Sequence, residues 1–218
     1  AIWMTPVSLG DAMDIAGAAG RMNPAVWTVD WNNSYNILSG LIGGMFLALA
    51  YFGCDQSQVQ RYLTGKSIAH AKLSLLFSAV AKIPMQFMIL FTGTMVFVFF
   101  TFTKPPVTFD PGVEKRIESS AGYQAMKVEY DAAWQARRAA AAQVPVNSGE
   151  FKQAQNRFDA ARARAGELAG MKPGADTNYI FLSFVTRFMP VGIVGLIMAA
   201  IFAAAMSTIS AEVNSLAT

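Results

Sequence analysis

The chain has 218 residues, of which 54% are hydrophobic and only 14% are charged. Because soluble domains carry about 25% charged residues, this composition excludes an ordinary soluble enzyme and a disordered tail. The 17 basic and 14 acidic side chains leave a net charge of +3 without a basic face, which excludes a nucleic-acid binder. Most of these charges lie in one block, residues 104–176, and the flanking parts of the chain are nearly uncharged.

The first part of the chain precedes two apolar segments. Residues 1–35 are rich in glycine, proline and asparagine, so we expect an extracytoplasmic loop with one short helix near Leu9 to Ala19. The apolar segments run from about Asn36 to Gly53 and from about Leu73 to Phe102. About 20 apolar residues suffice for a helix to cross a bilayer, so region 36–103 is predicted to hold two transmembrane helices.

The connection between these two helices, residues 54–72, carries Arg61, Lys66 and Lys72 against one acidic residue. Short loops with an excess of lysine and arginine lie on the cytoplasmic side, so we expect this loop there. The single cysteine, Cys54, begins the loop and is expected to be a small buried residue.

The charged block, residues 104–176, would then lie outside the cytoplasm, since long loops are translocated largely regardless of their charge. Two stretches are rich in helix-forming residues, Glu114 to about Gln143 and Glu150 to about Ala169. We expect an inserted extracytoplasmic helical hairpin with a structural role, and a binding module is the weaker alternative. Region 177–218 is predicted to re-enter the membrane and to form the third transmembrane helix, from about Val191 to Ile209. The predicted fold class is an all-α integral membrane protein of the cell (inner) membrane.

Lys82 lies inside the second apolar segment. A charge at that depth is costly, so its side chain is expected to face protein or water rather than lipid. Two interpretations stay open. The lysine is either a structural residue paired with an acid or with backbone carbonyls of another helix, or it contacts a polar solute.

Small and hydroxyl side chains are concentrated near the end of the third segment. Ala204 and Thr208 are one helical turn apart, and Ser207 is adjacent. Close helix packing is the more common role of such residues. The alternative is a hard-cation site, because two hydroxyl oxygens and a backbone carbonyl are neutral oxygen ligands that suit an alkali ion.

Glu212 follows Thr208 by four residues, which places its carboxylate on the same helix face one turn further along. Our hypothesis is that Glu212 keeps the inner vestibule negative and eases the release of a cation. The alternative is a salt bridge to a base of the inner loop such as Arg61.

Catalytic patterns are absent from the apolar part of the sequence. No Ser/His/Asp, Cys/His or paired-carboxylate set occurs there, and His70 stands alone in its loop. The sequence therefore predicts that the protein is not an enzyme and uses no organic cofactor.

Two stretches carry a specific resemblance. Residues 55–67 read D-Q-x-x-V-Q-R-x-L-x-x-K-S, and residues 190–218 contain P-x-G-x-x-G-L, A-A-x-M-S-T and N-S-x-x-T. These motifs resemble those of the sodium/solute symporter family, which includes the sodium–glucose cotransporters. The resemblance covers residues 1–103 and 177–218, and it implies three transmembrane helices that start the second repeat of a five-plus-five inverted-repeat transporter fold.

The resemblance also implies roles for individual residues. The sodium ligands of the family correspond to the carbonyl of Ala204 and the hydroxyls of Ser207 and Thr208. The tyrosine of the inner gate corresponds to Tyr51, and the substrate-side lysine of the sugar carriers corresponds to Lys82.

Some positions depart from the sugar-carrier pattern. Phe52 replaces a tryptophan beside the gate, and Ala48 and Ala50 replace polar or aromatic side chains on the turn before it.

The function implied is secondary active transport, in which inward sodium movement drives the uptake of a small organic solute, a sugar or another small polar metabolite, by alternating access. The expected partners are the solute, sodium as the coupling ion and the lipid bilayer. A transporter-like membrane sensor, with a partner bound to the extracytoplasmic hairpin, is the alternative function. A structural subunit without an ion site is a weaker third reading.

Overall fold

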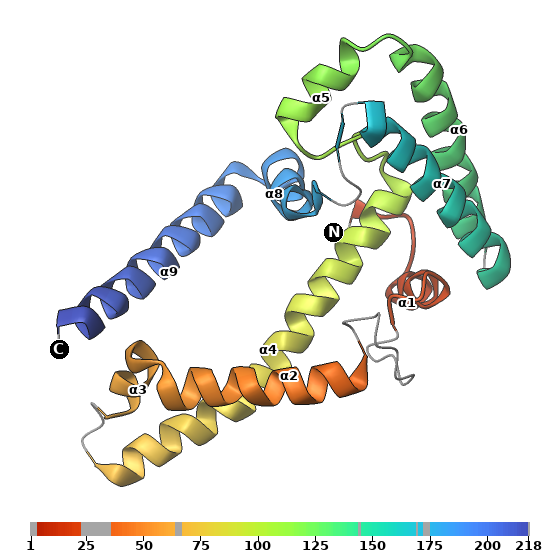
Figure 1. Cartoon of the computed structure of the whole chain (residues 1–218). Coiled ribbons are helices and arrows are strands. Elements are labelled where there is room, and N and C mark those ends of the chain that lie inside the picture. The colour runs from red at the N-terminus through yellow and green to blue at the C-terminus, as the bar shows by residue number, and fades with distance from the viewer. Residues whose placement is uncertain are drawn as a thin grey trace. The chain divides into compact units, whose positions relative to one another are not determined.

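The computed structural model describes residues 4–22, 36–63, 67–143, 145–168, 170–171 and 175–217, although not the side chains of residues 61–63. The elements of these residues are helices, as predicted (Figure 1). They are α1 (Leu9–Ala18), α2 (Ile37–Leu49), the π-helical segment η2 (Ala50–Cys54), α3 (Gln56–Leu63), α4 (Ile68–Phe102), α5 (Pro111–Glu118), α6 (Tyr123–Ala141), α7 (Ser148–Leu168), α8 (Thr177–Phe188) and α9 (Val191–Ala217).

The chain divides into two compact units. Unit 1 comprises the described residues of Ala1–Asn23 and Leu90–Met189, and unit 2 comprises those of Pro24–Ile89 and Pro190–Thr218. Unit 2 holds α2, η2, α3, the first part of α4 and α9, whereas unit 1 holds α1, the last part of α4 and helices α5 to α8.

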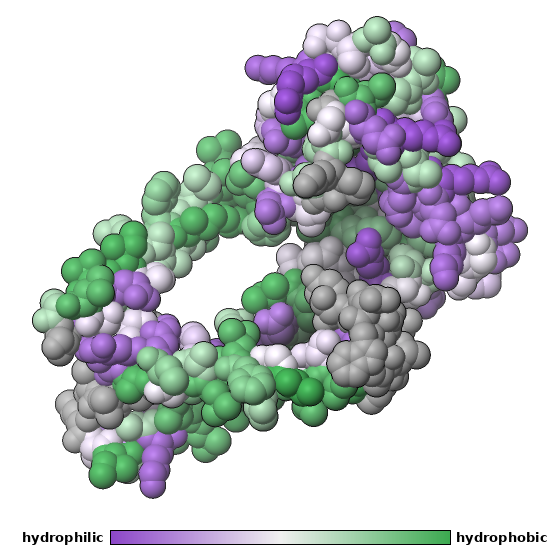
Figure 2. All heavy atoms as spheres, viewed as in Figure 1, coloured by the Kyte–Doolittle hydropathy of each residue, from purple (hydrophilic) through white to green (hydrophobic). Residues whose placement is uncertain are grey.

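Three helical stretches of the described chain are long and apolar enough to cross a membrane, as the sequence predicted. They are Ile37–Cys54, Ile68–Phe102 and Val191–Ala217. None of the most apolar part of the first and third stretches is buried inside the chain. Figure 2 shows hydrophobic surface along α2 and α9 and hydrophilic surface over α6 and α7. Helices that are apolar all round are typical of membrane spans.

The second span is a continuous helix that contains Pro84. Proline removes one backbone hydrogen bond from a helix, and membrane helices tolerate this because neighbouring groups satisfy the freed carbonyl. The helix begins at Ile68, five residues before the predicted start, and it ends at Phe102 as expected.

The predicted cytoplasmic loop has more regular structure than its sequence suggested. The π-helical segment closes with a hydrogen bond from the Asp55 amide to the Ala50 carbonyl at 2.9 Å, and α3 follows it directly. Asp55 starts this helix, because its Oδ1 accepts from the Ser57 amide at 3.0 Å and from the Ser57 hydroxyl at 2.7 Å. The prediction for Cys54 is wrong: the cysteine is exposed, as are Phe52 and Gly53 before it in η2.

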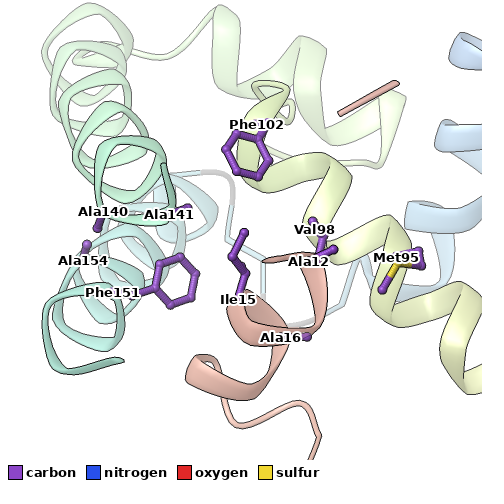
Figure 3. Packing of buried hydrophobic residues seen from close by; sticks show 10 residues of the cluster. All are labelled: Ala12, Ile15, Ala16, Met95, Val98, Phe102, Ala140, Ala141, Phe151 and Ala154. Carbon is purple, nitrogen blue, oxygen red and sulfur yellow. The ribbon is translucent and has the colours of Figure 1, made fainter. Parts of the chain in front are cut away.

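Unit 1 is built around an apolar core between four helices (Figure 3). Ile15 of α1 and Phe151 of α7 are fully buried there, beside Val98 of α4. Helix α1 has the predicted bounds to within one residue, and Ser8 and Asp11 form a capping box at its start. The complete cluster is Ala12, Ile15, Ala16, Met95, Val98, Phe102, Ala140, Ala141, Phe151 and Ala154.

The helix predicted from Glu114 to Gln143 is two helices in the structure, α5 and α6. The break lies at residues 119–122, where Gly122 has a φ of 100°. Residues with a side chain rarely adopt a φ in this left-handed region, so the glycine allows the turn between the helices. Helices α6 and α7 pack against each other as a helical hairpin.

We expect the Gly122→Ala substitution to destabilise unit 1 by about 1 kcal/mol, because alanine is strained at a positive φ. Gly17→Ala is the matched control, since Gly17 lies within α1 and has open space around the added methyl group. The control should be neutral or slightly stabilising. Thermal unfolding of the purified full-length variants measures both, and equal melting temperatures for the two variants would contradict the expectation.

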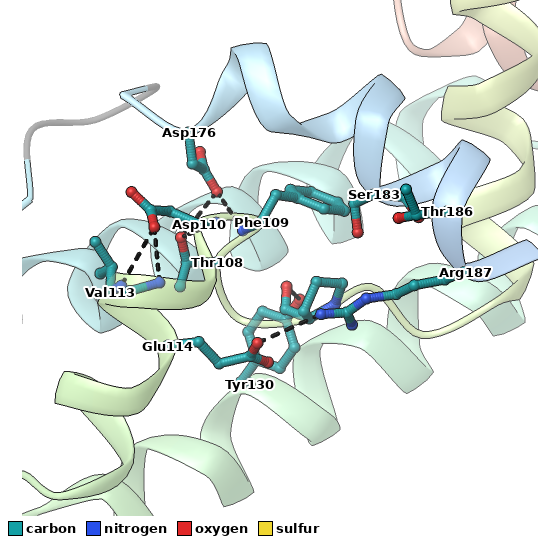
Figure 4. A network of polar contacts seen from close by, with 12 residues as sticks. Thr108, Phe109, Asp110, Val113, Glu114, Tyr130, Asp176, Ser183, Thr186 and Arg187 are labelled. Atoms are coloured by element: carbon teal, nitrogen blue, oxygen red, sulfur yellow. Dashed lines mark hydrogen bonds and ion pairs between the residues drawn. The ribbon is translucent and has the colours of Figure 1, made fainter. Parts of the chain in front are cut away.

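A buried polar network connects the start of α8 to the segment before α5 (Figure 4). Asp176 is 3% exposed, and its Oδ2 accepts from the Phe109 amide at 2.9 Å, from the Thr108 hydroxyl at 3.2 Å and from Arg162 at 2.6 Å. Burial alone would raise the pKa of Asp176. The hydrogen bond from Phe109, the charge of Arg162 and the bonds from Arg162 and Thr108 outweigh burial and lower the pKa.

A buried arginine connects the end of α4 to the helical hairpin. Arg137 donates to the Phe100 carbonyl and to Gln155 Oε1 at 3.4 Å, and its guanidinium lies 3.9 Å from the centroid of the Phe158 ring. Burial lowers the pKa of Arg137 to about 10, so the side chain remains charged at neutral pH. Its charge is offset by the carbonyl and by the aromatic face.

Candidate functional site

Three of the residues singled out from the sequence lie together in unit 2. The Lys82 ammonium nitrogen is 4.7 Å from the ring centroid of Tyr51 and 5.1 Å from that of Phe52. The two rings are 5.0 Å apart and nearly perpendicular, with an interplanar angle of 87°. The lysine therefore lies over the negative faces of both rings, which is the geometry of a cation–π interaction.

The π-helical segment accounts for the placement of the two rings. Tyr51 and Phe52 are consecutive residues, and in a regular helix consecutive side chains point about 100° apart. Segment η2 widens the helix at Ala50–Cys54, and its two rings meet edge to face. Single π-helical turns are frequent at functional sites.

The energy of the contact explains part of how a lysine is tolerated in the second span. Insertion of lysine at the centre of a membrane helix costs about 2.5–3.5 kcal/mol on translocon scales. A cation–π contact contributes about 0.5–2 kcal/mol. The two aromatic rings therefore offset a part of the cost of burying the lysine. Among the ion pairs of the described residues, none joins Lys82 to an acidic side chain.

The candidate ion ligands lie on α9, also in unit 2. The Thr208 hydroxyl donates to the Ala204 carbonyl at 3.0 Å, so two of the three candidate oxygens are adjacent on one face of the helix. Ser207, the residue directly before Thr208, is exposed. Hard cations are bound by oxygens at about 2.3–2.6 Å, so two oxygens this close can contact one ion.

The Thr208 hydrogen bond is a local preference of threonine and does not by itself identify a site. Thr94 donates to the Leu90 carbonyl at 3.0 Å, and Thr186 donates to the Leu182 carbonyl at 2.9 Å in the same way. Threonine hydroxyls in helices commonly bond the carbonyl four residues earlier. The bond nevertheless fixes where the Thr208 oxygen lies.

The two motif segments contact each other in unit 2, through residues that sequence reasoning left without a role. Asn214 of α9 donates to Gln60 of α3 at 3.2 Å. Both residues belong to the two family-like motifs, and this membership was the sequence signal that could have singled them out. The contact holds the end of α9 against the helix that follows η2.

Glu212 is exposed on α9, between Thr208 and Asn214, and its backbone carbonyl accepts from the Ser215 hydroxyl at 2.8 Å. The alternative partner of its carboxylate, the side chain of Arg61, lies outside the described residues.

Comparisons with known proteins bear on the family of the chain. The sequence model of the sodium:solute symporter family matches residues 159–218, which include the end of α7, α8 and α9. A sodium/glucose cotransporter of Vibrio parahaemolyticus is 28% identical over 191 residues, covering 86% of this chain and 25% of the relative. No solved structure matches the chain.

Two animal proteins match shorter stretches. The sodium-coupled monocarboxylate transporter 1 of Mus musculus is 43% identical over 63 residues, which are 28% of this chain and 10% of the relative. The sodium/iodide cotransporter of Homo sapiens is 29% identical over 93 residues, which are 43% of this chain and 14% of the relative. The chain thus spans a quarter or less of the length of these relatives.

The similarity reaches further into the charged block than the two motifs did. The family match begins inside α7, before the predicted boundary at residue 177. The match to the Vibrio protein covers 86% of the chain, which is more than the residues outside 104–176. The matches confirm that the chain is related to the sodium:solute symporter family.

Proposed function

We propose that the full-length protein is a secondary active transporter, which couples inward sodium movement to the uptake of a small organic solute by alternating access. The family match and the three sodium-coupled relatives support this reading. The names of these relatives include glucose, monocarboxylate and iodide, so they leave the solute open.

The observation that carries the ion assignment is the pair of oxygens on α9. The Ala204 carbonyl and the Thr208 hydroxyl lie 3.0 Å apart inside the stretch that the family model matches. In this proposal both oxygens and the Ser207 hydroxyl replace part of the water shell of sodium, and other parts of the full-length protein complete the site. Uncharged oxygens suit an alkali ion, because they bind the ion weakly enough to release it again.

The aromatic pair and the lysine have a separate role in the proposal. Tyr51 closes the inner side of the solute cavity, Phe52 lies beside it, and Lys82 contacts the solute. The contacts between the lysine and both rings support a shared role of the three side chains. In the proposed topology the protein lies in the cell (inner) membrane, and the helical hairpin lies on its extracytoplasmic side.

The test is uptake by the purified full-length protein in proteoliposomes, screened across sugars, carboxylates and amino acids. With an inward sodium gradient, at least one solute should accumulate, and replacing external sodium with potassium should abolish accumulation. Uptake of a solute at equal rates with and without the sodium gradient would contradict the proposal.

A separate prediction concerns Glu212. If its carboxylate draws sodium toward the inner side, Glu212→Gln should slow sodium release and lower the maximal uptake rate a few-fold, because one negative charge is lost near the exit. The measurement is the sodium dependence of uptake in the variant. Glu118→Gln is the control, since Glu118 is exposed on α5 in unit 1. Unchanged apparent sodium affinity and turnover in Glu212→Gln would dismiss the role.

A further inference from the structure

Hydrogen bonds fasten helix α3 to the π-helical segment before it. The Asp55 amide donates to the Ala50 carbonyl at 2.9 Å, which closes η2. The Asp55 carboxylate accepts from the amide and the hydroxyl of Ser57, at 3.0 Å and 2.7 Å, in the first turn of α3. Because Asp55 bonds to both elements, η2 and α3 form one segment, residues 50–63, which we call the gate segment.

The gate segment contacts α9 through a polar pair. Asn214 Nδ2 donates to Gln60 Oε1 at 3.2 Å, and α3 and α9 pack against each other (Figure 1). Gln60 belongs to the motif of residues 55–67, and Asn214 belongs to the motifs of residues 190–218. The bond therefore joins the two family-like stretches, one of which contains the proposed ion ligands.

This bond lies on the inner side of the proposed ion site. Asn214 follows Thr208 by six residues in the continuous helix α9, which is about 9 Å along the helix axis. Gln60 lies in the loop, residues 54–72, that is cytoplasmic in the proposed topology. An ion that leaves Thr208 toward the cytoplasm therefore moves toward the level of the bond between Asn214 and Gln60.

The strength of the bond suits a contact that forms and breaks repeatedly. Its donor and acceptor are uncharged amides, and a hydrogen bond between neutral side chains shifts an equilibrium between two states by about fivefold. A pair of opposite charges in the same place would bind more strongly and would hinder separation. Because each amide has both a donor and an acceptor, the pair can form again in either orientation.

We infer that Gln60 and Asn214 are positioning residues that hold the inner side closed, an inference that deepens the proposed function and rests on it. Their hydrogen bond forms while the gate segment lies against α9, and it breaks when the two separate to open the inner side. The closed state is the one that retains sodium in the proposed cycle. The bond thus links the position of Tyr51, in the same gate segment, to the helix of the ion ligands.

The test measures the equilibrium affinity of the purified full-length protein for radioactive sodium, without solute. Gln60→Met keeps the length of the side chain and removes its polar atoms, so the closed state loses the bond and becomes less populated. The apparent sodium affinity should fall by about two- to fivefold, with an unchanged number of binding sites. Gln58→Met, the same substitution two residues earlier in α3, is the control and should keep the wild-type affinity.

Acidic variants separate the effect of the hydrogen bond from that of charge. Gln60→Glu keeps an acceptor for the Asn214 amide, and Asn214→Asp keeps an acceptor for the Gln60 amide. Each single variant should therefore have at least the wild-type affinity for sodium. The double variant Gln60→Glu/Asn214→Asp has two acceptors and no donor, so it should bind sodium more weakly than either single variant. Charge alone predicts the opposite order, because two added carboxylates attract a cation.

The outcomes distinguish this inference from the proposed function. Wild-type sodium affinity in Gln60→Met, or equal weakening in Gln60→Glu, would overturn the role of the bond and leave the proposed function in place. Binding by the double variant as tight as that of the single variants would overturn the role as well, and this comparison decides if Gln60→Met yields no folded protein. Absence of saturable sodium binding to the wild type would overturn the proposed ion site and the inference with it.

Discussion

Removing the two hydroxyl groups of the proposed ion site should abolish sodium-stimulated uptake in the full-length protein. Thr208→Val keeps the shape of the side chain and removes the oxygen that lies 3.0 Å from the Ala204 carbonyl, and Ser207→Ala removes the neighbouring hydroxyl. Loss of even an outer-shell partner lowers metal affinity about 10–100-fold, so loss of two direct ligands should cost at least as much. The measurement is the sodium dependence of the initial uptake rate.

Two controls separate loss of ligands from loss of helix structure. Thr208→Ser keeps the hydroxyl and should keep sodium stimulation. Thr94→Val removes the same kind of hydrogen bond from α4, where the Thr94 hydroxyl bonds the Leu90 carbonyl, and it should leave the sodium dependence unchanged. Sodium-stimulated uptake at the wild-type level in the Ser207→Ala/Thr208→Val variant would refute the assignment.

The second large effect is expected at Asp176, where substitution by alanine should destabilise unit 1 by about 3–5 kcal/mol. The change removes the shared acceptor of the Phe109 amide, the Thr108 hydroxyl and the Arg162 guanidinium. Breaking a buried ion pair by removing one partner typically has this cost, because the other charge is left without a partner. Thermal unfolding of the full-length protein and amide hydrogen exchange at residues 108–110 measure the loss. Glu118→Ala, an exposed change on α5, should stay within about 0.5 kcal/mol of the wild type.

The same carboxylate predicts a pH dependence. Because the pKa of Asp176 is lowered in the folded protein, its contribution to stability is present above the pKa of the unfolded chain, about 3.9. The contribution is lost as the pH falls through the lower pKa of the folded state. The difference in melting temperature between the wild type and Asp176→Asn should therefore narrow below about pH 4. A difference that is constant from neutral pH to pH 3 would contradict this origin.

Local patterns predicted the helices that depend on composition. Uniformly apolar stretches gave the three candidate spans, and Ser8 with Asp11 marks the start of α1 within the predicted region. The predicted helix from Glu114 failed at Gly122, because a positive φ is not visible in a helix-rich composition. Helix α3 was missed because Gln56–Leu63 has only 8 residues and is polar on average, so it was interpreted as part of the loop between the two spans.

The candidate site was predictable only in part. Spacing alone brings Ala204 next to Thr208, since residues four apart share a helix face. The resemblance assigned roles to Tyr51 and Lys82 but did not predict their contact, which joins two helices and therefore lies beyond periodicity. The Asp176 network was not foreseen at all, because its partner Thr108 lies 68 residues away in the sequence. Such contacts depend on tertiary packing, which no local pattern encodes.

Direct binding of radioactive sodium to the purified full-length protein, in the absence of any solute, tests the central claim most directly. The account predicts saturable binding to the wild type that potassium does not displace, with the binding lost in the Ser207→Ala/Thr208→Val variant and kept in Thr208→Ser. Saturable sodium binding of unchanged affinity in the variant that lacks both hydroxyls would contradict the account.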